Sequence, residues 1–166
     1  MLQTPGLLDD NAPRVLTVAV TSRALFDLEE SHALFEREGL EAYLEYKRQH
    51  EDHVLEPGMA FPVVRKLLAL NQQLPAHAPK VEVILLSRNS SDTGLRIFNS
   101  IERYDLEIVR AAFTSGAPVW PYIKPFGAHL FLSANPESVR RSLDNGVAAA
   151  TILPARASTR ADTQLR

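Results

Sequence analysis

Three clusters of polar residues, each directly after a short apolar run, are the residues of this chain best placed to do chemistry. They are Thr21–Arg23, Ser87–Asn89 and Ser133–Asn135. Hydroxyl groups, backbone amides and guanidinium groups of this kind bind phosphoryl oxygens. None of the three clusters contains a carboxylate. The clusters therefore indicate both where a site is expected and what that site lacks.

The apolar runs in front of these clusters predict that the clusters share one edge of a sheet. Val15–Val20, Val81–Leu86 and Leu130–Leu132 are short and mainly apolar, which is typical of buried parallel strands. Ligands of open α/β sheets bind just beyond the carboxyl ends of such strands. We therefore expect a ligand site at that edge.

The polar clusters also have simpler explanations, which the sequence leaves open. Thr21–Arg23 fits a turn that holds a phosphate, and it fits equally an ordinary strand-to-helix turn with Arg23 in solvent. Ser91 or Asp92 can cap the helix that follows the second cluster. Capping explains part of that cluster but leaves Ser87, at the strand end itself, unexplained.

Lysine and histidine side chains supply the remaining candidates. Lys124 either reaches the carboxyl edge of the sheet or lies on the surface of a short helix. His50 and His53 sit at the end of a charged helix with no third ligand nearby, which favours a solvated helix end over a metal site. No partner can be assigned to the other histidines, so a hydrolase triad is unsupported. The candidates for binding phosphate or a nucleotide are Thr21, Ser22, Arg23, Ser87, Arg88, Asn89, Lys124 and Ser133.

The composition is that of a soluble globular domain. Of the 166 residues, 45% are hydrophobic and 23% are charged, and the net charge of -2 gives no electrostatic case for nucleic acid or a membrane as a partner. Without cysteines, disulfides and thiolate chemistry are excluded. No glycine-rich phosphate loop, signal peptide or membrane-spanning run is found. The cytoplasm is the expected compartment.

Strand patterns alternate with helical patterns, which predicts an α/β domain on a parallel sheet. The expected strands are 14–21, 81–86, 107–113, 128–132 and 147–153. The expected helices are 28–52 with a break at Gly39, 59–74, 93–104, a short helix within 119–126, and 135–145. Residues 1–13 form an arm, 14–153 the domain with a helical insertion at 27–57, and 154–166 a tail or linker.

Three of these helices carry specific signals. In the insertion, one stripe is formed by Leu40, Tyr43, Leu44 and Lys47. In helix 93–104, the residues expected to be buried are Leu95, Ile97, Phe98 and Ile101. In helix 135–145, Asn135 is the expected N-cap and Gly146 the left-handed C-terminal residue.

Five sequence blocks resemble the cytosolic 5'-nucleotidase type I family. They are residues 17–28, 56–62, 85–90, 94–101 and 128–135. The similarity extends from about Arg14 to Leu153. It implies a haloacid dehalogenase-like, Rossmannoid fold, with a parallel five-stranded sheet, helices on both faces and a small cap-like insertion after the first strand.

The same resemblance implies a chemistry that this chain does not match. Family members hydrolyse nucleoside 5'-monophosphates, notably AMP, with magnesium and an aspartyl-phosphate intermediate. Where an Asp-x-Asp motif is expected, this chain has Thr21 and Arg23; where further acids are expected, it has Ser133 and Ala134. The hydroxyl position is kept as Ser87, while Lys124 is the candidate for the family's lysine. No metal site is therefore expected in this chain.

The resemblance further implies a tandem pair of similar domains, of which this chain matches an inactive first one. Residues 158–166 would then lead into a catalytic C-terminal domain, the expected partner, and the domain could also support homo-oligomers. Two alternatives remain: a regulatory module that binds a nucleoside monophosphate or phosphate without hydrolysing it, and a standalone phosphohydrolase. The latter is disfavoured because no nucleophile–base pair is visible.

Overall fold

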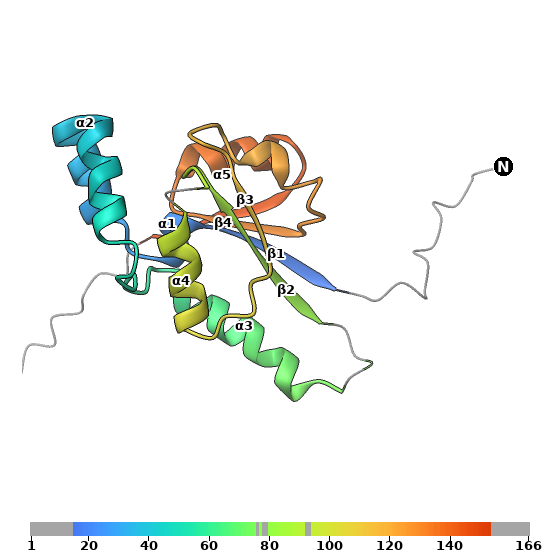
Figure 1. Cartoon of the computed structure of the whole chain (residues 1–166). Helices are drawn as coiled ribbons and strands as arrows, with labels where there is room; N and C mark the ends of the chain where they lie inside the picture. The colour runs from blue at the N-terminus through green and yellow to red at the C-terminus, as the bar shows by residue number, and fades with distance from the viewer. Residues whose placement is uncertain (1–14, 76, 78–79, 92–93, 154–166) are drawn as a thin grey trace, which may run out of the picture.

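The computed structural model describes residues 15–75, 77, 80–91 and 94–153 (Figure 1). The strands are β1 (Leu16–Thr21), β2 (Val81–Ser87), β3 (Arg110–Phe113), β4 (Leu130–Ser133) and β5 (Ala148–Thr151). The helices are α1 (Ser22–Leu25), α2 (Glu29–Gln49), α3 (Phe61–Gln73), α4 (Leu95–Arg103), the 3-10 turn η1 (Trp120–Tyr122) and α5 (Pro136–Asp144). All five expected strands are present. The arm 1–13 and the tail 154–166 lie outside the described residues.

The five strands form one parallel sheet in the order β3-β2-β1-β4-β5. β1 is the central strand because it pairs with β2 on one side and with β4 on the other. Thr21, Ser87 and Ser133 therefore end neighbouring strands at the same edge. The expected α/β architecture, a parallel five-stranded sheet with helices on both faces and an insertion after β1, is confirmed.

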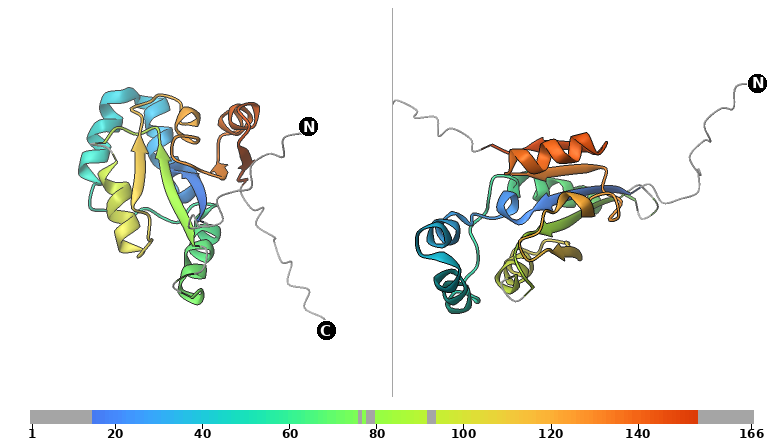
Figure 2. Two further views of the ribbon diagram at one scale, coloured as in Figure 1. Left: turned by 90° about the vertical axis from the view of Figure 1, so that its right-hand side faces the viewer. Right: turned by 90° about the horizontal axis from the view of Figure 1, so that it is seen from above.

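Helices cover both faces of the sheet, and two apolar cores result (Figure 2). Alternate residues of a strand point to opposite faces, so Val18 and Val20 pack with α3 and α4. Ala19, between them, packs on the other face with Val119 and Ile123, which flank η1. α5 lies on this second face, above β4 and β5 (Figure 1).

The insertion projects from the carboxyl edge of the sheet, as Figure 1 and the right-hand view of Figure 2 show. Its helix α2 bends at Gly39, where φ is 86°, as the sequence predicts. Its stem is narrow: Phe26 and Pro57 form an antiparallel bridge, and the amide of Gly58 donates to the carbonyl of Leu25 at 2.8 Å. The insertion is thus a separate layer held over the strand ends.

α4 fixes the returning end of the insertion through hydrogen bonds. The amide of Leu55 donates to Ser100 Oγ at 2.9 Å, and Tyr104 Oη donates to the carbonyl of Leu55 at 2.9 Å. Arg96 Nε donates to the carbonyl of His53 at 2.6 Å. These hydrogen bonds therefore join α4 to the segment through which the chain returns from the insertion to the core.

The caps of α5 are as predicted. Asn135 Oδ1 accepts from the amide of Ser138 at 3.0 Å, and Gly146 has φ of 73°. The cap expected at Ser91 or Asp92 is different: the residue that precedes α4 is Gly94, with no side-chain hydrogen bond, while Asp92 lies outside the described residues.

Two details of the helices differ from expectation. In α4, Ile97 and Ile101 are buried, but Leu95 and Phe98 are each 41% exposed. Phe98 packs against the ring of Phe113 at the edge strand, 5.2 Å between centroids, and does not enter the core. The segment 119–126 holds only the single turn η1. Pro121 is tolerated in the first turn, but Pro125 removes an amide donor that a longer helix would need.

Candidate functional site

A cleft of about 710 Å³ lies at the carboxyl edge of the sheet, between the strand ends and the insertion. Its polar side is formed by Thr21, Ser22, Arg23, Arg88, Asn89 and Ser133. Its apolar side comes largely from the insertion, and comprises Leu28, Phe35, Leu40, Tyr43 and Leu44. The cleft therefore has the place predicted for a ligand site in an open α/β sheet.

Serine hydroxyls link the strand ends beneath this cleft. Ser22 Oγ and Ser87 Oγ are 3.0 Å apart, and Thr21 Oγ1 donates to Ser133 Oγ over a longer 3.5 Å. Ser87 Oγ also accepts from the amide of Asn89 at 3.2 Å. Ser87 is only 1% exposed and does not line the cleft. The Ser87 hydroxyl therefore stabilises the turn after β2 by accepting the hydrogen bond from Asn89.

Ser133 plays a similar local part at the end of β4. Its Oγ accepts from the amide of Asn135 at 3.0 Å, two residues along the chain. The side chain is 1% exposed. This bond orders the turn that leads into α5.

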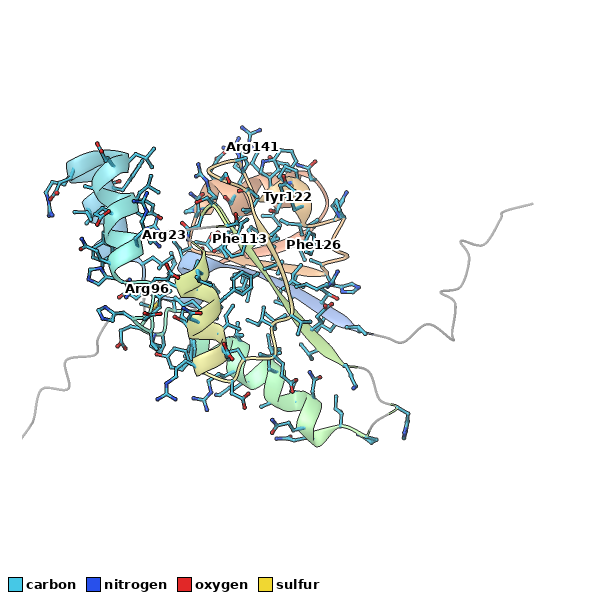
Figure 3. The ribbon with its side chains drawn as sticks, in the orientation of Figure 1. Arg23, Arg96, Phe113, Tyr122, Phe126 and Arg141 are labelled. Atoms are coloured by element: carbon cyan, nitrogen blue, oxygen red, sulfur yellow. The ribbon has the colours of Figure 1, made fainter. Side chains whose placement is uncertain are left out.

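The two arginines of the predicted site differ in their surroundings. Arg88 donates from Nε and Nη2 to the carbonyl of Gly116, at 3.0 and 2.7 Å. Its guanidinium therefore ties the β2 turn to the loop after β3. Arg23 is exposed in the turn α1, at the junction of the insertion and the core (Figure 3), and it lines the cleft. Both arginines are exposed and line the cleft, so both guanidinium groups lie where an anion could be met.

Lys124 is not brought together with the other candidates. It is exposed in the segment between η1 and β4. Its Nζ lies 3.8 Å from where a Cβ on Gly146 would be, just before β5 begins. The amino end of β5 is the opposite edge of the sheet from the cleft, so Lys124 lies on the surface away from the site.

His50 and His53 of the insertion pack against aromatic rings. His50 stacks on Tyr46, with ring centroids 4.0 Å apart, and His53 meets His50 edge-on at 5.1 Å. In the part of the chain that the structure describes, no group of three or more His, Cys, Asp or Glu side chains could hold a metal ion.

Tyr43 and Lys47 are functional candidates that the sequence did not single out. Tyr43 Oη donates to Asn89 Oδ1 at 2.9 Å, which closes the insertion onto the turn after β2. Burial raises the pKa of the Tyr43 hydroxyl. Lys47, one turn further along α2, is buried. The helical stripe through Leu40 and Tyr43 was the available signal, but it does not tell which residues the stripe would meet.

Comparison with known proteins places the chain in a family. The sequence profile of a family described as 5'-nucleotidase matches residues 8–166. This chain belongs to the 5'-nucleotidase family. Human cytosolic 5'-nucleotidase 1B is 34% identical over 156 residues, which cover 91% of this chain and 26% of that protein. The chain thus spans about a quarter of the length of this relative.

A solved structure of similar shape comes from a bacterium. It is the HAD domain of the effector protein Lem4 of Legionella pneumophila, with a TM-score of 0.47 and 12% sequence identity. The match covers 87% of this chain and 90% of that one.

The cleft of this 5'-nucleotidase family member does not offer the ligands that magnesium prefers. Mg²⁺ is held mainly by carboxylates and water in octahedral geometry. Among the described side chains that line the cleft there is no carboxylate, and two, Arg23 and Arg88, are cationic. The donor set therefore suits an anion better than a divalent cation.

None of the helices described here is long and apolar enough to cross a membrane.

Proposed function

We propose that this chain is the catalytically degenerate N-terminal domain of a cytosolic, magnesium-dependent 5'-nucleotidase that hydrolyses nucleoside 5'-monophosphates such as AMP. One observation carries the proposal: β1 ends at Thr21, followed by Arg23, where the family's chemistry needs two carboxylates. A hydroxyl and a guanidinium supply neither the nucleophile nor the metal ligands of an aspartyl-phosphate mechanism.

The proposed role is to support a catalytic domain of the same enzyme. The length of human cytosolic 5'-nucleotidase 1B, about four times the region matched here, supports a further domain as partner. In this role the fold, the cleft and the insertion are kept, while the metal and the hydrolysis belong to the partner domain. A homo-oligomer formed by this domain would fit the same role. The name of the relative, a cytosolic enzyme, supports a cytoplasmic location.

Titration with Mn²⁺, a paramagnetic substitute for Mg²⁺, tests the metal-free cleft. We expect the amide NMR signals of Thr21, Ser87 and Ser133 to broaden no more than those of exposed residues remote from the cleft, such as Lys66 on α3. Selective broadening at the three strand ends would show a metal site there and would contradict the proposal.

A second candidate function is a regulatory module that binds a nucleotide or phosphate without hydrolysing it. The observation that favours it is the cleft's division into a polar side with Arg23 and an apolar side with Phe35 and Tyr43. A phosphate next to Arg23 and an aromatic base on the apolar side would match these two surfaces.

Calorimetric titration with AMP, ADP, ATP and phosphate tests this second function. If it holds, at least one of these ligands binds, and Arg23→Gln weakens the binding at least about tenfold because a charge-assisted hydrogen bond is lost. Arg65→Gln, on the exposed side of α3, is the matched control and should leave the affinity unchanged. Absence of heat with all four ligands would leave the domain a purely structural role.

A further inference from the structure

Two buried polar atoms lack a hydrogen-bond partner within the described part of the chain: Lys47 Nζ and Asn89 Nδ2. Lys47 is only 3% exposed. Both groups are donors, and both belong to residues at the contact between the insertion and the core. A buried ammonium without a partner is costly, and unsatisfied buried donors in native proteins often mark an unseen water or ion.

Tyr43 contacts both residues that carry the unsatisfied donors. Lys47 Nζ sits over the Tyr43 ring, 5.3 Å from its centroid. The hydroxyl of the same ring donates to Asn89 Oδ1 at 2.9 Å, so the amide group of Asn89 is held by its oxygen while its nitrogen has no acceptor. Contact with the ring face compensates the charge of Lys47 only in part.

The charge around Lys47 adds to the case for an anion. Burial, and then the guanidinium of Arg96 on α4, lower the pKa of Lys47 to about 8. The side chain therefore still carries its proton at pH 7, next to a second positive charge. Arg96 lies on the side of α4 that holds the insertion (Figure 3). The group that would satisfy this environment is an acceptor with negative charge.

We infer that a small oxyanion of the phosphate or carboxylate class binds between α2 and the turn after β2, where it accepts hydrogen bonds from Lys47 Nζ and Asn89 Nδ2. Asn89 lines the cleft but Lys47 does not, so this site extends from the edge of the cleft to the buried end of Lys47. The inference therefore goes beyond the proposed function and does not depend on it. A bound anion would join the insertion to the core and hold the cleft closed at Tyr43.

Thermal and chemical unfolding of the whole chain in phosphate tests the inference. Sodium phosphate at pH 7 is compared with sodium chloride at the same ionic strength. At ten times its Kd, phosphate should raise the ratio of folded to unfolded protein roughly tenfold. Lys47→Met should abolish this response, while Lys66→Met, an exposed lysine on α3, should keep it. An equal response in wild type and Lys47→Met, or none in wild type, would overturn the inference.

Further arms separate this site from the cleft and identify the source of the anion. A phosphate response that Arg23→Gln removes and Lys47→Met keeps would place the anion in the cleft, and the inference would be wrong. AMP and phosphate acting alike, with adenosine inert, would be expected of a site that reads only the oxyanion. Asp92, outside the described residues, supplies the last arm: a phosphate response seen only in Asp92→Asn would mean that this carboxylate is the acceptor, and no external anion is needed.

Discussion

Lys47→Met is expected to raise the free energy of unfolding in phosphate-free buffer at pH 7 by about 1 to 3 kcal/mol. The substitution replaces a buried, unpartnered ammonium with an apolar side chain of similar length. The loss of the contact with the Tyr43 ring opposes the gain but is smaller. Urea denaturation measures the difference, with Lys66→Met as the control that should stay within about 0.5 kcal/mol of wild type.

The substitution at Lys47 should also change how the free energy of unfolding depends on pH. The pKa of Lys47 is about 8 in the folded chain and 10.5 ordinarily, so between these values the unfolded chain binds more protons. The stability of wild type should therefore rise with pH from about 8 toward 9.5, and Lys47→Met should flatten this rise. The groups that face Lys47 are Arg96 on α4, which stays charged, and Tyr43 on α2, whose raised pKa keeps it neutral in this window. A variant less stable than wild type at pH 7, with an unchanged pH profile, would contradict the claim that the buried charge of Lys47 destabilises the fold.

Gly58→Ala is expected to destabilise the chain by at least about 3 kcal/mol. A Cβ on Gly58 would lie 2.7 Å from the carbonyl oxygen of Ala24 and 2.8 Å from the backbone of Phe26. These are backbone atoms in the stem of the insertion and in the buried turn after β1, so they cannot move aside cheaply. The insertion should consequently loosen from the strand ends.

Gly116→Ala is the matched control for this substitution. Gly116 has φ of 91°, but a Cβ there meets nothing within 4 Å, so only the cost of the backbone conformation, about 1 kcal/mol, is expected. Thermal unfolding, and hydrogen exchange of the amides of Asp27 and residue 58, which donate across the stem, compare the two variants. A Gly58→Ala variant as stable as Gly116→Ala would show that the stem is not tightly packed.

Local patterns predicted the strands, the break at Gly39 and the caps of α5 because these features depend on neighbouring residues. The apolar runs that end at Thr21, Ser87 and Ser133 also placed the cleft correctly, since parallel strands share their carboxyl edge. The sequence placed Lys47 on the helical stripe of the insertion, but it did not tell that the side chain is buried near Arg96, because Arg96 lies far along the chain. The sequence likewise did not show that Lys124 lies near the amino end of β5, at the edge of the sheet opposite the cleft.

The candidate site was predicted in its location better than in its roles. Ser87 has the expected position, but it is buried and its hydroxyl is paired with that of Ser22, which follows another strand. Arg88 looks equivalent to Arg23 in sequence, yet it is held by the carbonyl of Gly116 from the loop after β3. Such partners come from distant segments, so only the folded chain shows them.

Phosphate release from AMP by the purified chain in the presence of Mg²⁺ tests the central claim most directly. Because the strand ends that line the cleft carry hydroxyls and a guanidinium in place of carboxylates, the rate is expected to equal that of a protein-free blank. Thr21→Ala and Ser87→Ala should make no difference. Magnesium-dependent phosphate release by wild type that is lost in either variant would show that this cleft is a working active site, and would contradict the account.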